Sequence, residues 1–275
     1  MSKRDFFSGP EPRLFAHRGA SACAPENTLD SFRLAWEAGA PYLELDVHLT
    51  GDDRLVVIHD SSVSRTTGRR GRVENMTLDA IRRLDAGCQF SPDWGRTFPY
   101  RGRGLVIPTL EEVLEAFPQA RLTIEIKRTR GGVEEKVAEA IQRCSTEERV
   151  IVASLEHRIL ERFRALEGGV HTSFSKSEVR EFLSRVRGKD WRDYRPPAPA
   201  LQVPEYFGLR RVVSPAVIEV AHHLGLEVHV WTVNEPVHIQ RLLHWGVDGV
   251  MTDDPARALS SVEGLREMAR AEGRC

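Results

Sequence analysis

The sequence predicts a (β/α)8 barrel, in which eight parallel strands form one closed sheet and the helices between them surround it. Two features of the sequence lead to this prediction. Short runs rich in Val, Ile and Leu recur along the 275 residues, and segments with helical spacing of apolar side chains separate most of them. Several of these segments end in glycine, as helices that turn back toward a strand often do. An open, doubly wound parallel sheet is the alternative that the same alternation allows.

The expected strands are apolar runs, short enough for strands and rich in β-branched side chains. In chain order they cover residues 14–17, 42–48, 122–127, 149–154, 169–174, 200–204, 227–233 and 248–252. The expected helices cover residues 28–39, 110–117, 133–144, 157–168, 176–188, 214–225 and 235–246. Asn27 or Thr28 would cap the first of these helices. Because strand and helix alternate almost throughout, we expect a parallel sheet with helical crossovers.

One long segment interrupts the alternation between the second and third strands. After a turn at 51–53, the apolar run 55–59 should fold back along the second strand, and an insertion at about 60–108 follows. The insertion contains one expected helix, 78–87, and several aromatic residues, namely Phe90, Trp94, Phe98 and Tyr100. Long insertions in compact barrels are often functional, so we expect this insertion to form a lid over the mouth of the barrel. A disordered loop is the alternative.

Composition supports one large domain, covering residues 1–275, with 41% hydrophobic side chains. The 39 basic and 40 acidic residues are interspersed, which argues against a nucleic-acid or anionic-membrane binder. No N-terminal apolar segment has signal-peptide length and nowhere do 18 apolar residues run together, so we expect a soluble cytoplasmic protein without stable membrane insertion. The cysteines lack CxxC spacing and indicate neither a zinc site nor a disulfide framework: Cys23, Cys88, Cys144 and Cys275. The oligomeric state is open.

The strand at 42–48 alternates strictly between apolar and polar residues, and its polar face holds Glu44, Asp46 and His48. If that face meets water, the pattern is an ordinary half-buried strand. If it lines a cavity, two carboxylates about 5 Å apart repel by roughly 3 kcal/mol at an effective dielectric near 20. A proton, a basic side chain or a metal must then neutralise them.

Other polar residues end the neighbouring strands, and a parallel barrel brings these ends together around one mouth. His17 and Arg18 end the first strand, and Glu125 and Lys127 repeat on the third strand the spacing of the carboxylates on the second. Carboxylate oxygens suit a hard cation, so the residues Glu44, Asp46 and Glu125 predict one Mg²⁺ or Ca²⁺ ion. A Glu–Lys ion-pair network inside the barrel is the alternative.

Two histidines close apolar runs near this mouth, His17 after the first strand and His59 after 55–58. An imidazole titrates close to working pH, so the pair can divide proton transfer between a general base and a general acid. Asp60 either orients His59 or forms a turn.

Several motifs together resemble the glycerophosphodiester phosphodiesterases: FAHRGASACAPENTLDSF, YLELDVHLTGDDRLVVIHDSSVSRTTG, LTIEIK, VHVWTVNE and GVDGVMTDDP, in this order. The resemblance runs from about residue 14 to 259 and implies a (β/α)8 barrel. The resemblance implies a role for each matching residue. The family's two catalytic histidines match His17 and His59, and its metal-binding carboxylates match Glu44, Asp46 and Glu125. Its basic residues that contact phosphate match Arg18 and Lys127.

The resemblance implies metal-dependent hydrolysis of a glycerophosphodiester to glycerol 3-phosphate and an alcohol such as choline or ethanolamine. A glycerol hydroxyl would lose its proton to one histidine and attack phosphorus, while the other histidine protonates the departing alcohol. A cyclic phosphate would form first, and water would open it with the histidine roles reversed. Which histidine acts first as the base, and which alcohol and cation are preferred, stay open.

Trp231 ends a strand and is expected either to contact the substrate or to lie in the core, and Gln202 is a further pocket candidate. Glu26 and Asn27 begin a helix, and either could also support the site from behind. Two other functions are alternatives in the same fold: a phospholipase for lysophospholipids, for which we see no strong apolar rim or amphipathic surface helix, and a noncatalytic sensor of glycerophosphodiesters.

Overall fold

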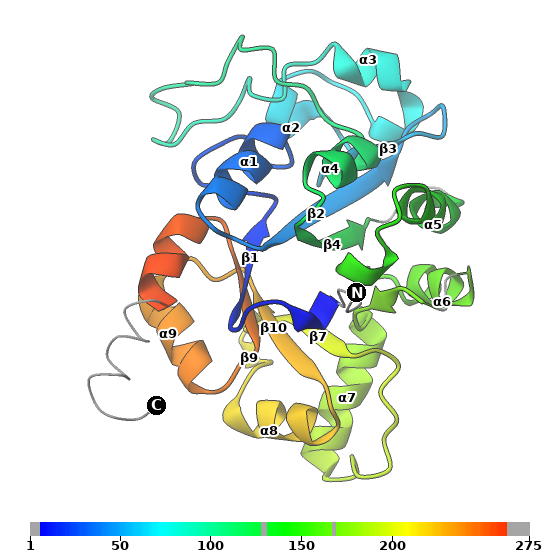
Figure 1. Ribbon diagram of the computed structural model, residues 1–275, viewed down its shortest axis with the longest axis vertical. Helices are drawn as coiled ribbons and strands as arrows, with labels where there is room; N and C mark the ends of the chain where they lie inside the picture. Colours follow the sequence, from blue (N-terminus) through cyan, green and yellow to red (C-terminus); the bar gives the residue numbers. More distant parts are fainter. Residues whose placement is uncertain (1–5, 128–130, 167–168, 263–275) are drawn as a thin grey trace.

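The computed structural model describes residues 6–127, 131–166 and 169–262. Its main sheet places the parallel strands in the order β6-β5-β4-β2-β1-β11-β10-β7. Their bounds are β1 Arg13–His17, β2 Tyr42–Leu49, β4 Arg121–Ile126, β5 Val150–Ala153, β6 His171–Thr172, β7 Ala200–Pro204, β10 Glu227–Trp231 and β11 Gly249–Thr252. The predicted barrel is therefore confirmed, and Figure 1 shows its strands surrounded by helices.

The barrel closes where the residues just after β6 meet the start of β7. Ser173 forms an isolated parallel bridge to Ala200, and the N–H of Phe174 donates to the carbonyl of Ala200 at 3.2 Å. The strand predicted at 169–174 is shorter than expected: β6 comprises only His171 and Thr172, and Ser173 donates its backbone N–H to Val152 of β5 while it bridges to Ala200 of β7. The open-sheet alternative is thus wrong, since both ends of the strand order meet.

The predicted helices are all present around the barrel: α1 Leu29–Glu37, α4 Leu110–Ala116, α5 Val133–Arg143, α6 His157–Leu166, α7 Lys176–Gly188, α8 Pro215–His223 and α9 Pro236–His244. Capping boxes start three of them, as in α1, where Thr28 and Ser31 cap each other's backbone N–H groups. Thr28 is therefore the cap of α1, which leaves the Asn27 side chain for another contact. No helix in the described ranges combines the length and the apolar character needed to cross a bilayer.

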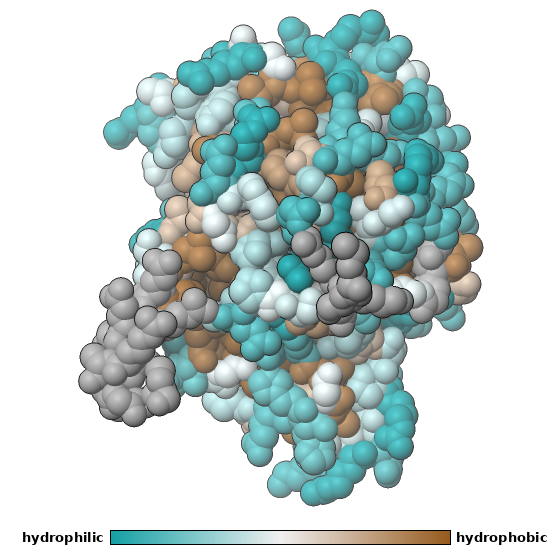
Figure 2. All heavy atoms as spheres, in the orientation of Figure 1, coloured by the Kyte–Doolittle hydropathy of each residue, from teal (hydrophilic) through white to brown (hydrophobic). Residues whose placement is uncertain are grey.

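Three apolar clusters hold the barrel and its helices together. One lies between α1, α4–α6 and strands β2, β4 and β5, and a second between α7–α9 and strands β7, β10 and β11. The third fills the bottom of the barrel, where the 3₁₀ helix η1 (Phe6–Ser8) brings Phe6 against Phe15 and Tyr42. The bottom is therefore packed, and the free cavity lies at the opposite, C-terminal ends of the strands. Figure 2 shows hydrophilic residues over most of one face of the molecule, as expected when the helices turn their apolar sides inward.

The insertion forms a small lobe with its own core. Strand β3 (Leu55–Val57) pairs antiparallel with β2, as predicted, and α2 (Ser64–Thr67), η2 (Val73–Asn75) and α3 (Leu78–Arg82) follow it. Apolar residues of this lobe pack mainly on one another, including Val56, Val63, Ile81 and Ile107, so the disordered-loop alternative is wrong. In Figure 1 the lobe lies next to α1 and α4.

The helix predicted at 78–87 ends five residues early. Arg83 caps α3, and the Asp85 carboxylate accepts hydrogen bonds from the backbone N–H groups of Gly87 and Gly102. These two bonds turn the chain where a longer helix would have continued.

A second small hairpin follows β7 and was not predicted. Its strands are β8 (Tyr206–Phe207) and β9 (Arg210–Arg211), joined by Gly208 and Leu209. Gly208 has a φ of +61°, a conformation that glycine adopts readily in two-residue hairpin turns. Each strand is only two residues long, which is too short for a periodic signal in the sequence.

Candidate active site

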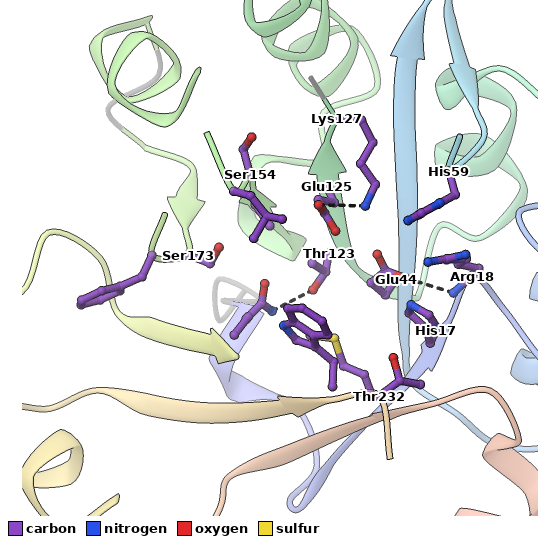
Figure 3. Close-up of a pocket in the computed structure, with 16 residues that line it drawn as sticks. His17, Arg18, Glu44, His59, Thr123, Glu125, Lys127, Ser154, Ser173 and Thr232 are labelled. Carbon is purple, nitrogen blue, oxygen red and sulfur yellow. Dashed lines mark hydrogen bonds and ion pairs between the residues drawn. The ribbon is translucent and has the colours of Figure 1, made fainter. Parts of the chain in front are cut away.

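A pocket of about 200 Å³ opens among the C-terminal ends of the barrel strands. Figure 3 shows His17, Arg18 and His59 on one side of it, Ser154 and Ser173 on the other, and Glu125 with Thr123 between them. The predicted site residues that line it are His17, Arg18, Glu44, His59, Glu125, Lys127, Gln202 and Trp231. Asp46 lies directly behind this lining, beside Lys127 and Arg18.

The predicted acidic cluster is formed by two neighbouring strands. Asp46 of β2 lies opposite Glu125 of β4 in the parallel register, and Glu44 lies two residues before Asp46 on the same face. One carboxylate oxygen from each of the three lies within 4.8 Å of the others. Glu44 and Asp46 are only 3% and 1% exposed, so the wet-face interpretation of the alternating strand is wrong. The polar face lines the barrel interior, and Leu43 and Leu45 pack in the outer core.

Two cationic side chains neutralise part of this charge. Lys127 Nζ lies 2.8 Å from Asp46 Oδ1 and 2.8 Å from Glu125 Oε1, and Arg18 Nε lies 3.2 Å from Asp46 Oδ2. The ion-pair network that was the alternative to a metal site is therefore present, but it centres on Asp46. Within the described chain, the hydrogen bond to the Glu44 carboxylate comes from the backbone N–H of Arg18, at 3.0 Å.

The side chains around Glu44 do not balance the charge of its ionised form. Burial, reinforced by the neighbouring Asp46 carboxylate, raises the pKa of Glu44 to about 8. A further cation beside Glu44 would hold it ionised at neutral pH, because opposite charge favours the charged form. Three clustered carboxylates that supply only oxygen therefore fit a hard divalent cation.

His17 is held by a carboxylate from the other end of the chain. Its Nδ1 lies 2.7 Å from Asp253 Oδ1, and Asp253 also accepts hydrogen bonds from Ser21 Oγ and Asn234 Nδ2. Burial would lower the pKa of His17, but the hydrogen bond to Asp253 and the charge of Glu44 outweigh it, so the pKa is raised. With Nδ1 occupied, Nε2 is the ring nitrogen available to a ligand.

The turn after His17 explains how this side chain and Arg18 reach the site. Gly19 has a φ of +83°, and a Cβ at this position would lie 2.4 Å from the hydroxyl oxygen of Ser31. Only glycine therefore lets the chain turn sharply against the start of α1. The turn places the Arg18 backbone N–H on Glu44 and its guanidinium on Asp46.

His59, like His17, is hydrogen-bonded to a carboxylate, in this case that of the adjacent Asp60. Its Nδ1 lies 2.7 Å from Asp60 Oδ1, and Arg65 Nε donates to Asp60 Oδ2 at 2.7 Å. Burial opposes ionisation of Asp60, but Arg65 and His59 lower its pKa to about 2. Asp60 therefore orients the imidazole, which was one of its two predicted roles. His48, the third polar residue of β2, lies 3.0 Å from the His59 carbonyl through Nε2 and supports the same segment.

Two residues at the start of α1 stand behind the site. Asn27 donates to Asp46 Oδ2 at 2.9 Å, and Glu26 binds Arg18 at 3.0 Å. Glu26 also pairs with Arg65, which connects the first strand with the lobe. The supporting role foreseen for Glu26 and Asn27 is consistent with these contacts.

Some residues of the site were not foreseen, or were placed wrongly. The sequence analysis assigned no role to Asp253, Asn234 or Arg65. Asp253 directly follows the last predicted strand, and this position alone would have placed it at the barrel mouth. The expected lid is wrong, because none of the residues that line the pocket comes from 60–108. Three aromatic residues of the lobe contact other residues of the lobe: Phe90 packs on Tyr100, and the Arg101 guanidinium lies over the Phe98 ring.

Trp231 and Gln202 form the wall opposite the histidines. Trp231 is half-buried: it lines the pocket and packs against the apolar cluster inside the barrel, and its contact with a substrate stays a prediction. Gln202 Nε2 donates to Thr123 Oγ1 at 3.2 Å, and its buried Oε1 has no hydrogen-bond partner in the described chain.

Two histidines, each hydrogen-bonded to a carboxylate, face a pocket at the mouth of a (β/α)8 barrel that is also lined by Arg18, Lys127 and carboxylates of the acidic cluster. This combination is typical of a (β/α)8-barrel enzyme, whose active site lies at the C-terminal ends of the strands. The chain belongs to the glycerophosphoryl diester phosphodiesterase family, which matches residues 17–257. This membership makes the chain an enzyme and argues against the noncatalytic sensor.

Individual relatives agree with this assignment. The glycerophosphodiester phosphodiesterase of Caldanaerobacter subterraneus subsp. tengcongensis is 34% identical over 256 residues, covering 90% of this chain and 97% of that protein. A solved glycerophosphoryl diester phosphodiesterase domain from Mycobacterium tuberculosis superposes with a TM-score of 0.79 at 25% identity, covering 90% of this chain and 98% of the other. An Oleispira antarctica phosphodiesterase, solved with the product sn-glycerol-3-phosphate, has a TM-score of 0.73 at 26% identity and covers 92% and 97%.

Proposed function

We propose that this enzyme hydrolyses glycerophosphodiesters to glycerol 3-phosphate and an alcohol, with one divalent cation, Mg²⁺ or Ca²⁺. The observation that carries the proposal is the meeting of His17, His59 and the carboxylates Glu44 and Glu125 around one small pocket. The product complex of the Oleispira antarctica relative supports glycerol 3-phosphate as the product here. The cytoplasmic location and the lack of stable membrane insertion stay predictions.

Glu44, Asp46 and Glu125 would hold the cation, because their oxygens cluster and Glu44 has the least compensated charge. When bound, the cation supplies electrostatic stabilisation of the charge that builds on oxygen during phosphoryl transfer. Arg18 and Lys127 line the same pocket, and their N–H groups would bind the nonbridging phosphate oxygens. Trp231 would lie against the glycerol or the alcohol.

The histidines would divide the proton transfers. One histidine accepts the proton of the glycerol 2-hydroxyl as that oxygen bonds to phosphorus, and the other gives its proton to the departing alcohol as the P–O bond breaks. Water then opens the cyclic phosphate with the roles reversed, and both histidines return to their starting states. Asp253 would keep the His17 ring in one orientation, and Asp60 would do the same for the His59 ring.

The test is release of glycerol 3-phosphate from glycerophosphocholine by the purified protein, first with chelator and then with Mg²⁺ or Ca²⁺ restored. We expect activity to vanish with chelator and to return with one of the cations. Activity that persists in chelator would remove the metal from the proposal. Absence of turnover with every cation would remove glycerophosphocholine as a substrate.

A further inference from the structure

Gln202 lies in the wall of the catalytic pocket with one polar atom unused. Its side chain is 8% exposed, and its Oε1 atom has no hydrogen-bond partner in the described part of the chain. A buried carbonyl oxygen that accepts no hydrogen bond costs free energy, so such an atom in a folded protein requires an explanation. Because Gln202 lines the pocket, a bound ligand can supply the missing donor.

The nitrogen of the same amide is held by two neighbours. Gln202 pairs with His229 in the parallel register of β7 and β10, so the two side chains lie on the same face of the sheet. Gln202 Nε2 lies 3.2 Å from Thr123 Oγ1 (Figure 3) and 3.4 Å from His229 Nδ1. An amide nitrogen has two hydrogens to donate, so these two acceptors use both of them.

A buried ion pair determines which end of the amide faces His229. Arg13 is buried and binds both carboxylate oxygens of Glu227, through Nε at 2.6 Å and through Nη2. His229 Nε2 lies 2.9 Å from Glu227 Oε2 and donates to it, because an ionised carboxylate can only accept. Since Arg13 and Glu227 balance each other's charge, a neutral His229 leaves this group of side chains uncharged, and its Nδ1 is then an acceptor. The amide therefore directs Nε2 toward His229 and leaves Oε1 free.

The chemistry of the proposed substrate leaves one group for this oxygen. The phosphate oxygens only accept hydrogen bonds, and the choline moiety of glycerophosphocholine carries neither an N–H nor an O–H group. The 2-hydroxyl gives its proton to a histidine in the proposed reaction, and the histidines lie across the pocket from Gln202. The primary hydroxyl of the glycerol is therefore the donor that remains.

We propose that Gln202 Oε1 accepts a hydrogen bond from the primary hydroxyl of the substrate's glycerol, which makes Gln202 a specificity-determining residue. This inference rests on the proposed function. A site built around a substrate hydroxyl rejects an analogue that lacks it, because the acceptor is then left buried and unpaired. The enzyme should therefore select glycerol diesters over propane-1,2-diol diesters, although both carry the hydroxyl that attacks phosphorus. An acyl ester at the primary position removes the same donor, so the proposal also disfavours the phospholipase alternative.

The experiment compares choline release from glycerophosphocholine and from 2-hydroxypropyl phosphocholine, which lacks only the primary hydroxyl. In the wild type, kcat/KM should be about 10- to 100-fold lower for the deoxy substrate. In Gln202→Leu, which has no hydrogen-bonding side-chain atom, the two substrates should differ by less than about threefold. Any general damage to the pocket affects both substrates, so the ratio isolates the contact with the hydroxyl.

Two further variants complete the comparison. Gln202→Asn keeps an amide but draws it back by one methylene, so it should also lose most of the preference, and it serves as the test if Gln202→Leu does not fold. Gln240→Leu is the matched control, because Gln240 lies on α9 and does not line the pocket. This control should keep the wild-type ratio.

Calorimetric titration of the two products gives a readout without turnover. Glycerol 3-phosphate should bind the wild type at least about tenfold more tightly than propane-1,2-diol 1-phosphate does, and the two should bind Gln202→Leu almost equally. Equal use of both substrates by the wild type overturns the inference even if glycerophosphocholine is hydrolysed, and so does a preference that the Gln202 variants retain. If neither diester is hydrolysed but the products still differ in the wild type and not in the variants, the proposed reaction fails and the contact stands.

Discussion

His17 and Asp253 lie 236 positions apart in the sequence, yet the His17 Nδ1 atom is 2.7 Å from Asp253 Oδ1. Parallel register between β1 and β11 brings the two strand ends side by side, since Ala16 pairs with Thr252. Asn234 and Ser21 hold the carboxylate in turn, so the orientation of the imidazole depends on three loops that end at the barrel mouth.

Asp253→Asn should lower kcat by about 10- to 100-fold, in line with the loss of a partner that orients a site histidine. Because the Asp253 carboxylate raises the pKa of His17, the variant should also show a lower His17 pKa. Histidine titration by NMR in chelator measures that shift. Asp254→Asn is the control, since Asp254 accepts a hydrogen bond from the Arg257 backbone and does not contact His17. An unchanged His17 pKa in Asp253→Asn would contradict the assignment.

His17→Ala and His59→Ala should each reduce turnover of glycerophosphocholine by about 10²- to 10⁴-fold, the usual contribution of a general acid or base. The fold should persist, because both side chains line the pocket and neither belongs to an apolar cluster. Circular dichroism and steady-state kinetics measure the two properties. His238→Ala, on the exposed surface of α9, serves as the control. Near-normal turnover in either site variant would exclude that histidine from the reaction.

Glu44→Gln should abolish stabilisation by the cation without harming the fold. In chelator, the variant's melting temperature should equal or exceed that of the wild type, because a buried and poorly compensated carboxylate has been removed. Saturating Mg²⁺ or Ca²⁺, at about 100 times its Kd, should stabilise the wild type by about 2.7 kcal/mol and the variant far less. Thermal scans with and without cation measure this. Glu115→Gln, on the exposed side of α4, should respond to the cation as the wild type does.

Glu178 offers a pH-dependent test of stability at a distance from the site. Burial opposes its ionisation, but Arg164 and the backbone N–H of Ser175 outweigh burial and lower the pKa of Glu178. A carboxyl whose pKa is lower in the folded state stabilises the fold above its unfolded pKa of about 4.3 and loses this contribution as the pH falls through the folded pKa.

Glu178→Gln should therefore lower the free energy of unfolding by about 1–3 kcal/mol at neutral pH. The difference from the wild type should shrink as the pH falls below about 4.3. Urea denaturation across this range measures it. Glu181→Gln removes an exposed pair with Arg185 and should cost less than about 1 kcal/mol at any pH. If the difference in the free energy of unfolding between the wild type and Glu178→Gln does not change with pH, ionisation of Glu178 does not contribute to stability.

Local sequence patterns were enough to predict the order of the barrel strands and helices and most of the residues at the barrel mouth. Alternation of short apolar runs with amphipathic segments is a local signal, and parallel strands necessarily gather their C-terminal ends at one edge. Glu44, Asp46 and Glu125 could therefore be grouped from their positions at the ends of two neighbouring strands. The strict alternation around Glu44 also showed which residues share a face.

The surroundings of that mouth depend on long-range packing, which local patterns do not encode. The lobe at 60–108 packs its apolar residues on one another instead of over the pocket, and no local pattern specifies the surface on which an insertion docks. The contact between His17 and Asp253 likewise depends on segments distant in the chain. Hydrophobic periodicity records which residues are buried but not which neighbours bury them, and long-range packing makes that choice.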